Sequence, residues 1–157
     1  MTAYLEVLAA LEQSGLGHAA RHSEWLFLVV NVLHVLGAAL VVGGIAVFDL
    51  KVLTDEGLDA PAVGRVAIPL AATGVALQVP TGLMLLAVEA TKLGINPAFY
   101  AKMAFLALGL VNVALFHARF GDAIRGEALP PSARAYALVS LVAWVLVLVA
   151  GRTIAYL

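Results

Sequence analysis

Four long stretches of apolar residues dominate the pattern of the chain, and short polar segments separate each stretch from the next. The first stretch has no charged side chain between Trp25 and Phe48. About 20 such residues are enough to cross a bilayer as a helix. We therefore predict four transmembrane helices, over residues 25–49, 66–90, 98–119 and 133–156.

The segment that precedes the first stretch, residues 2–22, has a different pattern. Leu8 and Leu11 repeat with helical spacing, and the glutamates of the segment lie on other faces. The segment is too short and too acidic to span a membrane. We expect an amphipathic interfacial helix that lies on the membrane surface and is broken at Ser14-Gly15.

Proline and capping residues predict where the helices begin and bend. Pro69 and Pro80 lie within the second span, where neighbouring helices can satisfy the carbonyls that proline leaves unpaired. Pro97 suits the first turn of the third span, and Ser132 suits the N-cap of the fourth. The acidic segment 54–64 is predicted to be a surface connection.

Four spans joined by short loops predict an all-α integral membrane protein, an up-down-up-down bundle that forms a single domain over residues 1–157. Both termini then lie on one side of the membrane. Basic residues collect in cytoplasmic loops, and the third loop carries Arg125 and Arg134 beyond Arg119 at the end of the third span. We therefore expect the termini on the periplasmic side of a bacterial inner membrane.

The composition supports a membrane protein and narrows its chemistry. Of 157 residues, 63% are hydrophobic and 12% are charged, whereas a soluble domain has about 25% charged residues. The net charge of -1 gives no indication of a nucleic-acid partner. With no cysteine and no Ser–His–acid set at one depth, we expect no stand-alone catalytic activity.

Each span carries at least one polar side chain near its middle. Polar groups are costly in lipid, so they should face the interior of the bundle. Four of them fall within roughly 6 Å of their span centres: His34, Gln78, Asn112 and Trp144. Asn31 and Ser140 extend this intramembrane polar cluster. Amides in such positions also serve simply as hydrogen-bonding contacts between helices.

His34 is the residue that most directly suggests a function. A neutral imidazole is an axial haem ligand, a metal ligand or a proton carrier. His117 is the obvious second ligand, although the two histidines differ in depth by about 12–16 Å. Arg119 could pair with haem propionates. Arg152 could do the same, bind a lipid head group, or pair with Glu24.

Several short motifs together resemble a known family. They cover nearly the whole chain: Leu33-His34-Val35-Leu36-Gly37, Phe48-Asp49-Leu50-Lys51, Asn96-Pro97-Ala98-Phe99, Leu115-Phe116-His117 and Gly151-Arg152-Thr153-Ile154-Ala155-Tyr156. In these motifs the chain resembles an uncharacterised bacterial family of small four-span membrane proteins, which implies a fold but no activity. In layout it is more distantly similar to small b-type cytochromes and to copper-resistance membrane proteins.

These observations predict a small integral membrane protein that binds haem b or assists electron transport, with His34 and His117 as candidate iron ligands. One alternative is a structural or assembly subunit of a membrane complex, acting as a homo-oligomer or with a partner subunit. A further alternative is a transport or channel component that uses the polar cluster.

Overall fold

The structure is a computed structural model, and it describes residues 2–54, 60–126 and 129–157. In chain order the helices are α1 (Thr2–Glu12), α2 (Gly15–His22), α3 (Glu24–Thr54), α4 (Ala60–Val88), α5 (Ala90–Leu93), α6 (Pro97–Gly126), α7 (Ala133–Thr153) and the 3-10 helix η1 (Ile154–Tyr156). The acidic residues Asp55, Glu56 and Asp59 of the predicted surface connection lie outside the described residues, as does the side chain of Arg125.

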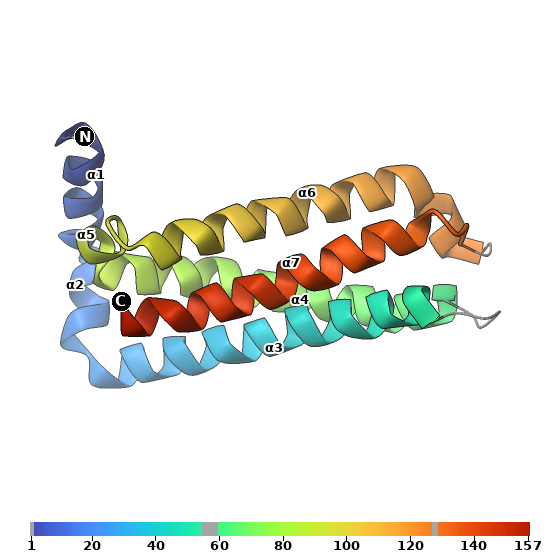
Figure 1. Ribbon diagram of the computed structural model, residues 1–157. Coiled ribbons are helices and arrows are strands. Elements are labelled where there is room, and N and C mark those ends of the chain that lie inside the picture. The colour runs from blue at the N-terminus through green and yellow to red at the C-terminus, as the bar shows by residue number, and fades with distance from the viewer. Residues whose placement is uncertain (1, 55–59, 127–128) are drawn as a thin grey trace.

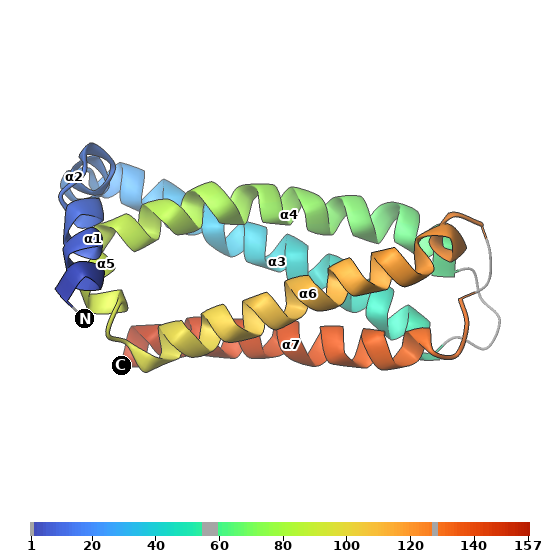
Figure 2. The same cartoon turned by 90° about the horizontal axis from the view of Figure 1, so that it is seen from above.

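Within the described residues, four helices are long and apolar enough to cross a membrane: Glu24–Thr54, Pro61–Val88, Pro97–Ile124 and Ala133–Tyr156. They confirm the helical fold class and the number of long apolar helices. Each long helix runs antiparallel to the next, so that the two chain ends lie at one end of the bundle (Figures 1 and 2).

Helix α4 begins at Ala60, before its predicted start at 66, and two long helices continue past their predicted ends. The first was predicted to end at 49 and the third at 119, but α3 continues to Thr54 and α6 to Gly126. The reason is burial, because Val52 and Phe120 continue the buried faces of their helices. A polar residue is not enough to end a helix while its apolar neighbours still pack.

The helix-start predictions have mixed outcomes. Pro97 opens α6 as expected, and the side chain of Asn96 accepts a hydrogen bond from the backbone N–H of Ala98 at 2.9 Å. Pro69 and Pro80 lie inside α4, also as expected. Ser132 stands at the N-cap position of α7 as predicted, but it has helical backbone angles and its side chain makes no capping bond.

Close backbone contact joins α3 and α4, the pair of helices that holds His34. A Cβ atom on Gly74 would lie 2.6 Å from the backbone nitrogen of Val41 and 2.7 Å from the carbonyl oxygen of Gly37. Only glycine fits there, since real Cβ atoms do not approach backbone so closely. Gly37 and Gly74 therefore serve the packing of α3 against α4.

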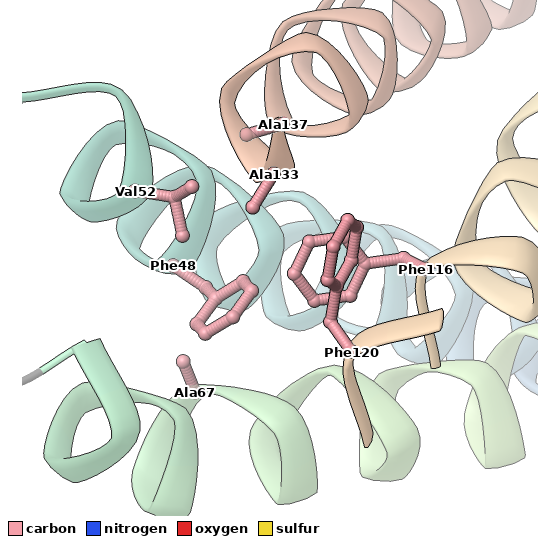
Figure 3. Packing of buried hydrophobic residues seen from close by; sticks show 7 residues of the cluster. All are labelled: Phe48, Val52, Ala67, Phe116, Phe120, Ala133 and Ala137. Carbon is pink, nitrogen blue, oxygen red and sulfur yellow. The ribbon is translucent and has the colours of Figure 1, made fainter. Parts of the chain in front are cut away.

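An aromatic core joins the four long helices near the end opposite the chain termini (Figure 3). Its buried members are Phe48, Val52, Ala67, Phe116, Phe120, Ala133 and Ala137. The rings of Phe48 and Phe116 meet edge to face with centroids 5.7 Å apart, an arrangement that aromatic pairs favour. This core fixes α3, α4, α6 and α7 relative to one another.

Helices α1 and α2 lie across the end of the bundle where both termini are found (Figure 1). Ser14 accepts a hydrogen bond from the N–H of Gly17 and caps α2, which confirms the predicted break. Arg21 donates to the carbonyl oxygen of Val88 at 3.1 Å, and Glu12 accepts from the hydroxyl of Thr91 at 2.7 Å. Two side chains thus attach the N-terminal helices to the end of α4 and to α5.

Candidate functional site

His34 lies half-buried on α3 and is hydrogen-bonded to α4. Its Nδ1 is 2.9 Å from Oγ1 of Thr81, and the Thr81 hydroxyl donates to the carbonyl oxygen of Leu77. A carbonyl only accepts, so the hydroxyl proton points to Leu77 and Thr81 is left to accept from Nδ1–H. The neutral imidazole then carries its free lone pair on Nε2.

Helix α4 also fixes the backbone and the ring edge of His34. Gln78 donates its side-chain amide N–H to the carbonyl oxygen of His34. A Cβ atom on Gly82 would lie 3.2 Å from Cε1 of the ring, so α4 packs closely beside it. Gln78 was predicted to be near His34, and here it acts as a hydrogen-bonding contact between helices.

Lys102 of α6 brings a positive charge to the same level of the bundle. It is half-buried and close enough to His34 for its charge to act on the imidazole. Its Cε and Nζ pack against Gly151 of α7, 3.6 and 3.7 Å from the position of an added Cβ. We call His34, Gln78, Thr81 and Lys102 the His34 cluster.

Arg152 follows Gly151 and is exposed at the same end of the bundle. It donates to the hydroxyl of Tyr156 at 2.9 Å, and its guanidinium lies 5.1 Å from the centroid of that ring. In the described residues its partner is therefore Tyr156 and not Glu24, so the predicted Glu24–Arg152 pair is wrong.

A second polar group lies farther along the bundle, around a cavity of about 180 Å³. We call it the Asp49 cavity. It is lined by Gly44, Ile45, Phe48, Asp49, Ala67, Ile68, Ala71, Ala72, Val75, Leu110, Asn112, Val113, Phe116, His117, Tyr136, Ser140 and Trp144. Asp49 and Trp144 are each only 5% exposed. Asn112 donates to the carbonyl oxygen of Tyr136 at 3.0 Å and joins α6 to α7.

His117 belongs to the Asp49 cavity and not to the His34 cluster. It is exposed, and its Nδ1–H donates to the carbonyl oxygen of Val113 at 2.9 Å. On α3, His34 precedes Gly44, the first residue of that helix in the cavity lining, by ten residues or about 15 Å. The structure therefore does not bring the two histidines together.

Arg119 and Asn31 also lie apart from the cluster. Arg119 is exposed, with its guanidinium 5.9 Å from the centroid of the Phe120 ring. The prediction that Asn31 faces the bundle interior is wrong, since the residue is exposed. The buried face of α3 includes Val30 and Gly37, and one residue beyond Val30 points about 100° away from it.

The predicted polar cluster is therefore two separate groups. His34 and Gln78 lie in one, while Asn112, Ser140 and Trp144 lie in the other. Sequence reasoning missed Asp49, which it placed at the end of the first span and not among the polar groups of the interior. The signal that could have placed it was the apolar pair that follows, Val52-Leu53, which keeps α3 helical and packed.

Comparisons with protein-family models, with curated proteins and with solved structures found no match. The resemblance to a four-span bacterial family stays a prediction. In the part of the chain that the structure describes, no group of three or more His, Asp or Glu side chains is placed to hold a metal ion. The iron of a haem is already bound by the nitrogens of its ring and needs only one imidazole from the protein. His34 alone would therefore be enough to hold a haem.

Proposed function

We propose that the chain is a multi-pass protein of the bacterial inner membrane that binds haem b through His34 and assists electron transfer. One observation carries the proposal, namely the hydrogen bond between His34 and Thr81. It leaves the lone pair on Nε2, the atom through which His34 would hold the iron, and it orients the ring. The termini are proposed to lie on the periplasmic side.

The chemistry of the surrounding residues fits such a cofactor. A haem carries two anionic propionates, and Lys102 provides a half-buried ammonium group at the level of His34. Arg152 lies at the same end of the bundle and is a second candidate partner. Gly82 lies beside His34 and Gly151 lies beside Lys102, so no side chain from these two positions fills the space next to them. A bound haem would supply one-electron chemistry there.

His117 and Arg119 have no part in this proposed site, because they lie at the level of the Asp49 cavity. Of the two histidines predicted as iron ligands, only His34 therefore belongs to this proposed site. Visible absorption spectra of the purified wild type and of His34→Ala test the proposal, with His117→Ala as the matched control. We expect the haem bands to depend on His34 alone.

A second function, as a subunit of a larger membrane complex, is favoured by the position of Asn31. This side chain is exposed on α3 among exposed apolar neighbours such as Leu28 and Val35. An amide is costly against lipid, and it is a common contact between transmembrane helices. A partner helix or a second copy of the chain would cover this face.

A further inference from the structure

Two histidines in the last turns of α2, His18 and His22, lie against each other on the surface of the molecule. Both are exposed, and their rings stack with centroids 3.9 Å apart and an angle of 11° between their planes. Residues four apart in a helix leave the same face of it, so the contact follows from their spacing in the sequence. Neither residue belongs to the His34 cluster or lines the Asp49 cavity.

A hydrogen bond determines which ring nitrogen of His22 carries the proton. Its Nδ1 lies 2.9 Å from the carbonyl oxygen of His18. A carbonyl oxygen only accepts, so Nδ1 is the donor and the lone pair of the neutral ring is on Nε2. Histidines that bind metal ions are oriented in the same way, with the other ring nitrogen donating to a carbonyl or a carboxylate. His22 is thus arranged as a metal ligand would be.

The two histidines stand on an anchored helix, at the end of the bundle where both termini are found (Figure 1). Ser14 caps the first turn of α2. Arg21, which lies between the histidines in the sequence, donates to the carbonyl oxygen of Val88 at 3.1 Å and ties α2 to α4. The backbone that carries both imidazole rings is therefore held in place before any ligand binds.

Two neutral imidazoles on one helix face form a chelating pair for a metal ion. Histidines one turn apart bind zinc together in the helices of metalloproteases. A metal ion holds imidazole nitrogens at about 2.0 Å, so two neighbouring ones lie about 3 Å apart. The ring centroids of His18 and His22 are already 3.9 Å apart, and both side chains are exposed. Rotation of the side chains therefore reaches this geometry without a change in the helix.

We propose that His18 and His22 bind a divalent transition-metal ion, with Cu²⁺ bound most tightly. Imidazole suits copper, nickel and zinc, and a site of nitrogen ligands binds Cu²⁺ more strongly than the other two. Among the described residues no third His, Asp or Glu completes the group, so water or a ligand from another molecule fills the remaining positions. The site is separate from the proposed haem site, since His34 lies ten residues into α3, about 15 Å along that helix.

Electron paramagnetic resonance of Cu²⁺ tests the site, because the spectrum reports the nitrogen ligands of the ion. Protein without a histidine tag is purified in detergent and titrated with Cu²⁺. A bound haem iron adds a signal of its own, so the titration is repeated in the His34→Ala background. His18→Asn and His22→Asn each remove one ligand. Both are changes at exposed positions, so neither should disturb folding.

We expect a saturable Cu²⁺ site with nitrogen ligands, for which Ni²⁺ and Zn²⁺ compete less strongly. His18→Asn and His22→Asn should each weaken Cu²⁺ binding about tenfold or more, because even the loss of a residue that only supports a metal ligand costs that much.

His117→Asn is the matched control for these variants. His117 is also exposed, and its Nδ1–H also donates to the carbonyl oxygen four residues earlier. It does not share a helix face with a second histidine, so its replacement should leave the Cu²⁺ affinity unchanged. Absence of a saturable site, or unaltered Cu²⁺ affinity in either His18→Asn or His22→Asn, would overturn the proposal.

Discussion

Nδ1 of His34 lies 2.9 Å from Oγ1 of Thr81, and this contact determines which imidazole nitrogen carries the proton. The Thr81 hydroxyl is itself donated to the carbonyl oxygen of Leu77, one turn earlier on α4. The carbonyl oxygen of Leu77 can only accept, so the Thr81 hydroxyl donates to it and accepts from Nδ1–H of His34. Helix α4 thus controls the chemistry of a histidine on α3.

Replacing Thr81 by valine removes the acceptor for Nδ1–H while it keeps the shape of the side chain. We expect the wild-type imidazole to be one tautomer, with its proton on Nδ1, and the Thr81→Val imidazole to be a mixture. Nitrogen NMR of labelled histidine measures this without any cofactor. Haem affinity should fall about 10- to 100-fold, as it does when support for a ligating histidine is lost.

Thr73→Val is the control for this prediction. The Thr73 hydroxyl is exposed and donates to the carbonyl oxygen of Pro69 in its own helix. Its loss should leave both the tautomer and the haem affinity unchanged. Identical His34 spectra in wild type and Thr81→Val would contradict the proposed role of the hydroxyl.

Glycine at position 74 should be necessary for the packing of α3 against α4. An added Cβ would meet backbone atoms of α3 at 2.6–2.7 Å, so Gly74→Ala must push the helices apart. We expect a loss of about 1–3 kcal/mol in the free energy of unfolding. In Gly43→Ala no atom lies within 4 Å of the new methyl group, so this substitution should not lower the free energy of unfolding. Thermal unfolding followed by circular dichroism in detergent compares the two variants, and equal melting temperatures would count against this packing.

Attachment of the N-terminal helices should weaken in acid. Hydrogen bonds from the hydroxyl and the backbone N–H of Thr91 lower the pKa of Glu12 from its ordinary value of 4.5, and Arg21 adds to the effect. Because the folded pKa is the lower one, the stabilisation is complete above pH 4.5 and is lost as the pH falls through the lowered value.

Distances between spin labels test this pH dependence. The chain has no cysteine, so labels can be placed at Val7→Cys on α1 and Val149→Cys on α7, both exposed positions. We expect a narrow distance distribution at neutral pH and a broader one in acid. Glu12→Gln should be broad at both pH values, and a narrow distribution for that variant would refute the role given to Glu12.

The exposed face of α3 around Asn31 should lie against another helix in the membrane. If the partner is a second copy, Asn31→Cys should form a disulfide-linked dimer on mild oxidation of membranes. Val66→Cys, at another exposed position, on α4, controls for random collision. If both variants stay monomeric, the partner of this face must be a different protein. If the protein then also purifies without any other protein bound, the subunit function is contradicted.

The long helices were predictable because lipid imposes a simple rule on length and polarity. Trp25 to Phe48 contains no charge and is long enough to cross a bilayer as a helix. Pro97 and Ser14 marked helix starts correctly, since both act through their own backbone or side chain. The helix ends were less predictable, because Val52 and Phe120 extend their helices through contacts with other helices.

The site was only partly predictable, because helical spacing fixes a face but not its neighbours. Asn31 and His34 are one turn apart, yet only His34 reaches α4. Asp49 shares a cavity with Trp144, although 95 positions separate them in the chain. Which polar groups meet depends on how the helices are staggered, and no local pattern encodes that stagger.

The most direct test of the account is the visible absorption spectrum of the protein purified in detergent, oxidised and after dithionite. We predict a Soret band with sharp reduced α and β bands for wild type and for His117→Ala. The same bands should be lost in His34→Ala, whose folding is checked by circular dichroism. A colourless wild type expressed with haem available, or bands that persist in His34→Ala, would contradict the proposed haem site.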